Sequence, residues 1–271
     1  MRPPRSAAVS PARISIIMRN KYLIGAARVL LPLVFWGGLL WLLAALLDKP
    51  LLLPTLPAIG KALLALGGEG SFWLAIAASL VRVLGGLGIG VTLGALFGVL
   101  VHIFPAVALL IRPLLTVVRS TPVASFVILV WSFTGSRTLP LVIAALMVLP
   151  IVADELATGL SGADPALGEV VRLYRLSPWR RLLTYRLPAA LPYFFGALIT
   201  SVGFAWKAGI AAEILANTAG SLGNGIYTAK LHLETPELWA WTLTVIVLSL
   251  LLEFFVKKTL RFLERRAAWV R

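Results

Sequence analysis

The feature that most constrains the fold is a series of long apolar stretches that recur along the chain. Six of them, at residues 29–47, 74–103, 106–133, 139–158, 189–212 and 238–256, reach the length of about 20 residues that a helix needs to cross a bilayer. Backbone N–H and C=O groups find no water inside a bilayer, so spanning segments of this kind form helices. We therefore expect an all-α, polytopic membrane protein with about six transmembrane helices.

The composition agrees with this class and limits the alternatives. Hydrophobic residues make up 59% of the chain and charged residues only 13%, which lies outside the range of soluble domains. In 271 residues, six spans leave no room for a separate soluble enzyme. The absence of cysteine excludes disulfides and cysteine nucleophiles. His102 and His232 lie far apart with no further ligand at metal spacing, so we expect no metal site.

Basic residues predict the orientation. Nineteen of the 25 Lys and Arg residues fall in the tails at 1–28 and 257–271, in a loop around Arg112 and Arg119, and in the loop that contains Glu169. The positive-inside rule places these regions in the cytoplasm and residues 29–256 in one transmembrane domain. The net charge of +14 therefore indicates topology rather than nucleic acid binding. The first stretch lacks a small-residue cleavage site, so we expect a membrane anchor and not a signal peptide.

Glycines recur at every fourth position of the second stretch, at Gly86, Gly90, Gly94 and Gly98. Such a row forms a ridge without side chains along which another helix can pack closely, and a hinge is the alternative. No Gly-Lys-Ser/Thr follows these glycines, so they do not form a phosphate-binding loop. We expect no cofactor on this chain, and any ATP must be used by a partner.

A polar segment at residues 163–191 separates two of the apolar stretches. Residues before Pro178 can form a short amphipathic helix that presents Val170, Val171 and Leu173 or Tyr174 together. Such a face predicts a docking surface, whereas a topology signal alone is the alternative reading of the arginines. The segment contains five of them: Arg172, Arg175, Arg180, Arg181 and Arg186.

The spacing in this segment resembles the EAA loop of binding-protein-dependent ABC importer permeases. That pattern is Glu-Ala-Ala, three residues, Gly, nine residues, an aliphatic residue, any residue and Leu-Pro. Glu169 takes the acidic position, Val170 and Val171 replace the alanines, and the final pair is Leu187 and Pro188. The chain departs from the pattern at two positions.

The departures are Arg175 at the usual glycine and Tyr185 at the usual aliphatic residue, so the local turn can differ. Other stretches resemble the nitrate/taurine/sulfonate branch of these permeases. They are Ser79-Leu80-Val81-Arg82-Val83, Arg119-Ser120-Thr121-Pro122, Trp131-Ser132-Phe133-Thr134-Gly135, Leu187-Pro188-Ala189-Ala190-Leu191-Pro192, Ala205-Trp206 and Ala211-Ala212-Glu213.

The resemblance implies a non-catalytic subunit in a bacterial inner membrane. It would form a homodimer with a translocation path at the interface, two cytoplasmic ATPases that hold ATP and Mg, and an extracytoplasmic binding protein. The cargo would be a sulfonate, taurine, nitrate or a similar small anion, with a pyrimidine or vitamin precursor as the alternative. The loop at 163–188 would couple to the ATPase through Glu169, Val170, Val171, Arg172, Tyr174, Arg175, Leu187 and Pro188.

Charged residues within spans are costly, by about 2.5–3.5 kcal/mol at a helix centre, so Lys207 and Glu213 need an explanation. Lys207 can line the path or pair with an acid of another helix, and Glu213 can be interfacial. Asp154 and Glu155 are expected to cap or pair. The candidate path residues are Arg119, Pro122, Trp131, Trp206, Lys207 and Glu213.

Two outer segments, 51–71 and 219–235, are predicted either to receive a binding protein or to form interfacial helices. A secondary transporter is expected to show repeated halves with matching interrupted helices. Only one span is interrupted, the stretch at 106–133, in which Pro122 breaks or kinks the helix. A membrane-embedded enzyme needs a cluster of acids, histidines or a nucleophile beside a base, and the sequence shows none.

Overall fold

A computed structural model describes residues 31–32, 34–39, 41–43, 45–46 and 53–268, without the side chains of Arg172 and of residues 263–268. The chain divides into two units, residues 1–59 and 60–271, which are described separately. The described elements are helices: α2 (Leu56–Gly67), α3 (Gly70–Ile103), α4 (Pro105–Ser120), α5 (Val123–Trp131), α6 (Leu139–Ser161), α7 (Pro165–Leu173), α8 (Pro178–Arg181), the π-helix η1 (Leu182–Arg186), α9 (Leu187–Leu215), α10 (Leu222–Leu231) and α11 (Thr235–Ala268).

In the first unit, the described residues of the predicted span at 29–47 are all helical. Their large apolar side chains are exposed, as for Leu31, Phe35 and Trp36, which suits a helix surrounded by lipid. The remaining residues of that span and the basic tail at 1–28 lie outside the described residues.

The second unit contains four helices long and apolar enough to cross a membrane. They are α3, α6, the rod Pro178–Leu215 that includes α8 to α9, and Thr235–Phe262 of α11. These match the second, fourth, fifth and sixth predicted spans, and the fold is the predicted polytopic all-α class. The predicted tail boundary after residue 256 is not a break in secondary structure, because α11 runs on to Ala268.

The third predicted span is not one straight crossing. Helices α4 and α5 pass the same length and hydropathy test only together, and they are bent by 107° at Thr121 and Pro122. Pro122 has no backbone N–H, so the helical ladder ends there and restarts in α5. Arg112 and Arg119 lie within α4, which spans Pro105–Ser120. Only Phe104 separates this helix from α3. The predicted loop around the two arginines is therefore wrong.

The four periodic glycines of α3 are buried against α6. A Cβ atom would lie 2.3 Å from a carbonyl oxygen of α6 at Gly86, 2.7 Å at Gly90 and at Gly94, and 2.8 Å at Gly98. Real Cβ atoms do not approach so closely, so only glycine permits this contact between the two backbones. The row therefore joins α3 to α6 along four turns.

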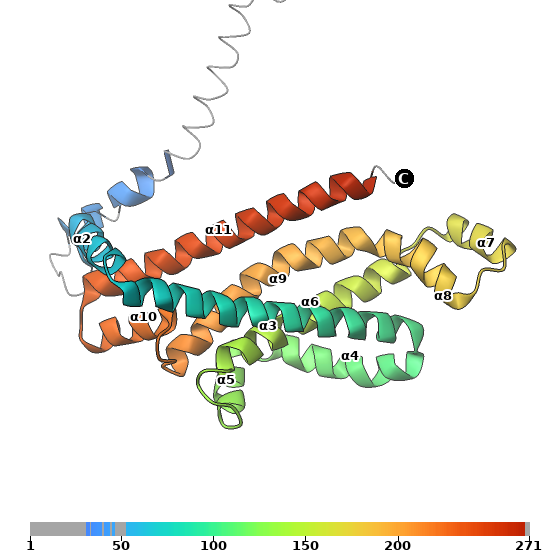
Figure 1. Cartoon of the computed structure of the whole chain (residues 1–271), viewed down its shortest axis with the longest axis horizontal. Helices are drawn as coiled ribbons and strands as arrows, with labels where there is room; N and C mark the ends of the chain where they lie inside the picture. The colour runs from blue at the N-terminus through green and yellow to red at the C-terminus, as the bar shows by residue number, and fades with distance from the viewer. Residues whose placement is uncertain (1–30, 33, 40, 44, 47–52, 269–271) are drawn as a thin grey trace, which may run out of the picture. The chain divides into compact units, whose positions relative to one another are not determined.

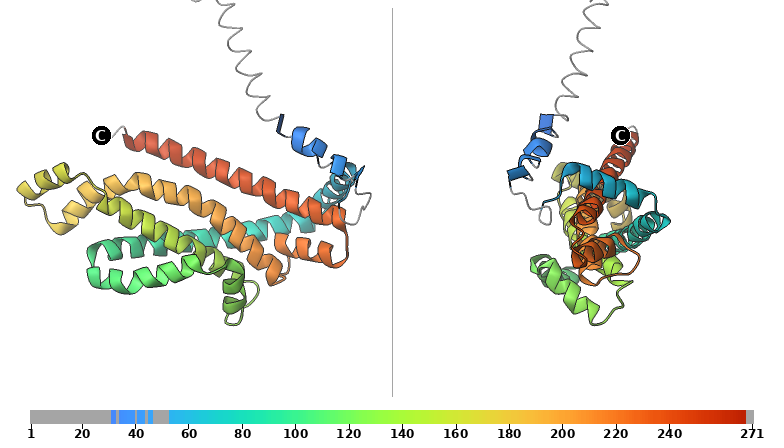
Figure 2. Two further views of the ribbon diagram at one scale, coloured as in Figure 1. Left: turned by 180° about the vertical axis from the view of Figure 1, so that it is seen from behind. Right: turned by 90° about the vertical axis from the view of Figure 1, so that its left-hand side faces the viewer.

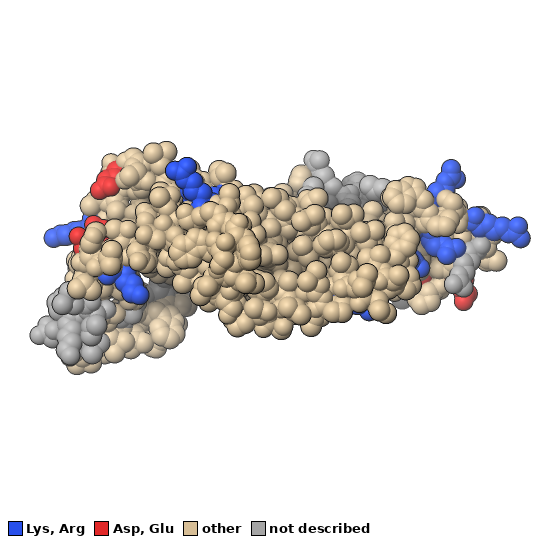
Figure 3. All heavy atoms as spheres, turned by 90° about the horizontal axis from the view of Figure 1, so that it is seen from below, with Lys and Arg blue, Asp and Glu red and all other residues tan. Residues whose placement is uncertain are grey.

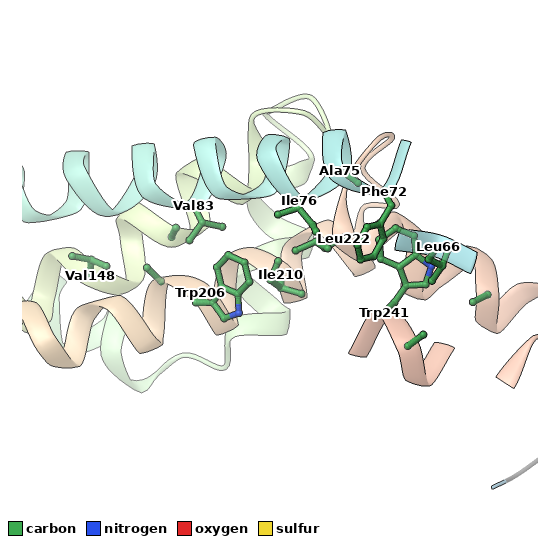
Figure 4. Close-up of a cluster of buried hydrophobic side chains, with 14 of the residues drawn as sticks. Leu66, Phe72, Ala75, Ile76, Val83, Val148, Trp206, Ile210, Leu222 and Trp241 are labelled. Atoms are coloured by element: carbon green, nitrogen blue, oxygen red, sulfur yellow. The ribbon is translucent and has the colours of Figure 1, made fainter. Parts of the chain in front are cut away.

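A core of buried apolar side chains joins α3, α6, α9 and α11 (Figure 4). Trp206 of α9 is at its centre with 1% exposure, beside Val83 of α3 and Ile210 of its own helix. Its indole Nε1 donates a hydrogen bond of 3.1 Å to the carbonyl oxygen of Val245 on α11. A buried indole needs such a partner, so this bond fixes α11 to α9.

The second unit has two distinct ends, which we call the α7 end and the α10 end after the short helices that lie there (Figures 1 and 2). The connection between α3 and α4 lies at the α7 end (Figure 1). On the face drawn in Figure 3, Lys, Arg, Asp and Glu gather toward both ends, and the middle is almost free of them. That distribution suits a helical bundle whose centre lies in lipid.

Candidate coupling segment and translocation surface

The predicted docking loop folds into a helical hairpin at the α7 end, which we call the coupling segment (residues 163–188; Figure 1). Asp164 caps α7, because its Oδ1 accepts a hydrogen bond of 2.9 Å from the backbone N–H of Ala166. Ser177 caps α8 by accepting from the N–H of Arg180. Pro165 and Pro178 stand at the first positions of the two helices, where a missing N–H costs nothing.

The turn between α7 and α8 contains a strained residue. Arg175 has a φ of +49°, in the left-handed region that non-glycine residues rarely occupy. This is the position at which the EAA pattern has glycine. Arg175 therefore adopts a backbone conformation that glycine adopts readily.

The second departure, Tyr185, holds α7 against the helix that follows. Its hydroxyl donates a hydrogen bond to the backbone carbonyl oxygen of Asp164. A Cβ at Gly168 would lie 3.0 Å from the same hydroxyl, so the ring passes close to the α7 backbone. Tyr185 thus replaces an aliphatic contact with an aromatic ring and a hydrogen bond.

Tyr185 belongs to the π-helix η1, which joins α8 to α9. The N–H of Leu187 bonds to the carbonyl oxygen of Leu182, five residues earlier. The next residue, Pro188, has no N–H to continue an α-helical ladder, which favours the wider turn. Leu187 and Pro188 therefore begin α9, the helix that carries the coupling segment. They do not lie on the exposed face of the coupling segment.

The exposed face of the coupling segment is apolar. Leu167 is 56% exposed, Val170 46%, Leu173 82% and Tyr174 77%. Their spacing places them on one side of α7. Glu169 is exposed beside this face, and Val171 is half-buried. The side chain of Arg172 lies outside the described part of the structure. An apolar face without a covering element marks a surface for a partner.

The six predicted path residues fall into two groups. Pro122 lies just before α5, Trp131 is the last residue of α5, and Lys207 lies on α9. All three are exposed. Arg119 is exposed on α4 and forms an ion pair with Asp154 of α6, so Asp154 pairs as predicted. Among the described side chains, no acidic residue pairs with Lys207, which leaves the alternative that it lines a surface.

Trp206 and Glu213 form the second group and lie inside the protein. Glu213 has no exposed surface, and its carboxylate accepts hydrogen bonds from Ser79 Oγ at 2.7 Å, Arg82 Nη1 at 3.0 Å and the N–H of Gly223 at 3.2 Å. Ser79 Oγ in turn accepts from the N–H of Leu222, at the start of α10. Glu213 is therefore buried within the protein, where it joins α3, α9 and α10.

Sequence reasoning missed this buried network. The signal was present, because one acid and one base each interrupt an otherwise apolar span, and such residues usually pair. A Cβ at Gly223 would lie 2.4 Å from that of Glu213, so glycine is needed where α10 approaches the carboxylate. The two stretches containing Arg82 and Glu213 that resemble the permease branch are thus joined in space.

A second polar chain lies at the α7 end. Arg186 of η1 donates to His102 Nε2, and His102 Nδ1 lies 3.1 Å from Ser161 Oγ. Ser161 Oγ donates to the carbonyl oxygen of Ala157 at 2.9 Å. When the imidazole carries its proton on Nδ1, that nitrogen donates to Ser161 Oγ and Nε2 accepts from Arg186, so every hydrogen bond of this network has one donor and one acceptor. Among the residues described, no group of three His, Cys, Asp or Glu side chains could hold a metal.

Comparisons with known proteins identify the family. Residues 90–269 match the family model described as binding-protein-dependent transport system inner membrane component. The chain is 31% identical over 199 residues to the bicarbonate transport system permease protein CmpB of Synechococcus elongatus, covering 73% of this chain and 71% of that protein. It is 28% identical over 234 residues to the taurine transport system permease protein TauC of Escherichia coli, covering 83% of both.

Solved structures show the same fold. The chain is similar to a bacterial alginate ABC transporter in complex with a periplasmic protein, with a TM-score of 0.62 and 16% identity over 93% of this chain and 98% of that chain. It is also similar to the inward-facing MetNI methionine ABC transporter, with a TM-score of 0.60 and 18% identity over 72% and 98%. The chain belongs to the binding-protein-dependent inner membrane components, as an ABC importer permease of the nitrate/taurine/sulfonate type.

Proposed function

We propose that this permease forms the translocation path for a small anion delivered by an extracytoplasmic binding protein. The proposal draws on relatives named for bicarbonate and taurine transport, and on a putative aliphatic sulfonates permease of Bacillus subtilis. Two copies of the chain would enclose the path between them. It would run along the exposed side of α4, α5 and α9, where Arg119, Pro122, Trp131 and Lys207 lie.

The coupling segment carries the proposal. Its apolar face is exposed, and it is attached to the bundle through a continuous rod from α8 to α9 and through the Tyr185 hydrogen bond. A force applied to α7 would therefore move a membrane helix rather than a loose loop. Two ATPases that bind ATP and Mg would each hold one coupling segment, and their closure would rock the helices from inward-open to outward-open.

This arrangement implies a topology. The coupling segment would meet a cytoplasmic ATPase, so the α7 end would face the cytoplasm, as would both termini, in a bacterial inner membrane. The basic residues of the coupling segment and of the last turns of α11 agree with that orientation. At the α10 end, α2 and α10 would meet the binding protein. Catalysis would reside in the ATPase, and this subunit would be non-catalytic.

The test is assembly and coupling in lipid. Val170→Asp changes an exposed side chain, so it should spare the fold, whereas an unpaired carboxylate buried at the docking surface is costly. We expect it to weaken co-purification with the ATPase by about 10-fold or more and to abolish stimulation of ATP hydrolysis by the binding protein, since each 1.4 kcal/mol is a factor of ten. Val170→Ile is the matched control and should behave as wild type.

Glu169→Lys combined with Val171→Asp gives a second disruption of the same surface. If both disruptive variants assemble and respond to the binding protein like wild type, the coupling assignment is wrong. Ion-driven uptake by the purified chain alone, without an ATPase, would instead identify a secondary carrier.

A further inference from the structure

A polar pocket of about 650 Å³ opens beside α4 and α6, toward the α7 end. Its polar lining consists of Arg112 and Arg119 from α4 and of Asp154, Thr158 and Ser161 from α6. The volume lies within the range of about 300–1,000 Å³ found for small-molecule sites. The exposed apolar residues of α7 do not line this pocket.

The two arginines face the same pocket because of their spacing. They are seven residues apart, which is two turns of α4, so they share one side of the helix about 10 Å apart along its axis. An arginine inside an apolar span is costly and marks a functional site by default. Of the described carboxylates, none forms an ion pair with Arg112.

Arg119 has a partner that it can exchange. Its ion pair with Asp154 has side chains that are 59% and 39% exposed. In the water-filled path that we propose, such an exposed pair would be weak, so an incoming anion could displace the carboxylate. The pocket then offers two guanidinium groups, whose planar donor arrangement fits the oxygens of a carboxylate, sulfonate, nitrate or bicarbonate.

We propose that Arg112 and Arg119 form an anion-binding subsite of the translocation path, in which Asp154 competes with the anion for Arg119. The inference rests on the proposed function and adds Arg112 and Asp154 to it. Competition keeps the affinity low, because binding must replace an existing ion pair. A low-affinity site near the α7 end suits release, since a transported ion must leave as readily as it enters.

The pocket also adjoins the coupling segment. Its lining residue Ser161 meets His102, which accepts from Arg186 of η1. A movement of η1 is therefore transmitted to one wall of the pocket through two hydrogen bonds. This gives a physical route by which the state of the ATPase changes the shape of the subsite.

The experiment measures anion binding to the full-length permease in nanodiscs of neutral phosphatidylcholine, using taurine, nitrate, bicarbonate and methanesulfonate as probes. We expect Arg112→Gln and Arg119→Gln each to weaken binding by about 10-fold or more, the size of one lost charge-assisted contact. Asp154→Asn should strengthen binding, because the competitor is removed. Arg137→Gln, at an exposed arginine outside the pocket, is the control and should leave binding unchanged.

Opposite effects of Asp154→Asn and the two arginine variants would support the subsite. Equal binding in wild type and Arg112→Gln would overturn it, as would no binding of any probe to wild type. A phospholipid headgroup presents the same oxyanion chemistry, so the measurement is repeated with phosphatidylglycerol. If only the lipid responds to the arginine variants, transported anions do not use the pocket and the inference is also overturned.

Failure of this inference can be told from failure of the proposed function. Assembly with the ATPase and stimulation of ATP hydrolysis by the binding protein are measured on the same Arg112→Gln preparation. Intact coupling with unchanged anion binding rejects the subsite alone. If the wild-type permease neither assembles with the ATPase nor shows stimulation of ATP hydrolysis by the binding protein, the proposed function is rejected.

Discussion

Arg175 holds a backbone conformation that favours glycine, in the turn between α7 and α8. The left-handed conformation costs a non-glycine residue about 1–2 kcal/mol, and the flexibility of glycine in the unfolded chain offsets about 0.5–1 kcal/mol of the gain. The turn is thus formed with an arginine at the position where the pattern has glycine.

Arg175→Gly should therefore stabilise the coupling segment by about 0.5–1 kcal/mol, the difference between those two terms. Hydrogen exchange of the amides of residues 166–174 should slow by about 2- to 5-fold, as this free energy dictates. Arg180→Gly is the matched control: Arg180 is helical, so glycine there should speed exchange. Equal effects of the two substitutions would contradict a specific strain at Arg175.

Glu213 is the other residue with a conformational role that one can test directly. Its carboxylate is fully buried and paired with Arg82, whose side chain is 18% exposed. Removing one partner of a buried pair leaves the other charge uncompensated, at a cost of about 3–5 kcal/mol. Ser79 and Gly223 cannot replace the lost charge, because both are neutral donors.

Glu213→Gln should lower the thermal stability of the purified permease by about this amount, and Arg82→Gln/Glu213→Gln should lose less than the sum of the single variants. Thermal unfolding in detergent measures both effects. Were Glu213 instead a path residue, Glu213→Gln would block uptake while leaving the unfolding temperature unchanged, and that result would refute the structural role.

At the scale of elements, the contact between α3 and α6 depends on the absence of side chains. Gly90 faces Ala145 and Val148 of α6, whereas a Cβ at Gly88 of the same helix would meet no atom within 4 Å. The two glycines therefore form a matched pair, two residues apart, with opposite surroundings.

Gly90→Ala should destabilise the protein by about 1–3 kcal/mol, because the added methyl group forces the helices apart. Gly88→Ala should be neutral or stabilising by up to about 1 kcal/mol, because alanine favours a helix over glycine. Thermal unfolding of the two variants side by side measures the difference. A similar loss in both would mean that helix propensity, and not packing, determines the outcome.

For the molecule as a whole, the sequence predicted the class, four of the spans and the helix of the coupling segment, because long apolar runs and helical periodicity are local signals. It predicted a break in the third span at Pro122, which is confirmed, but not the angle of 107° between α4 and α5, since a proline fixes a break but not its angle. The pairing of Arg82 with Glu213 joins residues 131 positions apart, which single-sequence patterns do not encode.

The burial of the candidate path residues was predicted less well than the helix of the coupling segment. Trp206 and Glu213 were selected for their unusual chemistry within an apolar stretch, and both proved to be core residues. Chemistry alone does not tell which side of a membrane helix faces the protein, because lipid-facing and core-facing residues are both apolar there.

The π-turn at Leu182–Arg186 has a genetic consequence. A π-turn holds one more residue than an α-helix needs over the same rise, and each residue of an α-helix turns the chain by about 100°. Loss of a single codon within this turn would therefore restore an ordinary α-helical turn and leave the direction of the apolar face of α7 nearly unchanged. Loss of one codon from the regular α-helix that follows, at the start of α9, would instead rotate the coupling segment by about 100° about the axis of the rod and point the apolar face of α7 elsewhere.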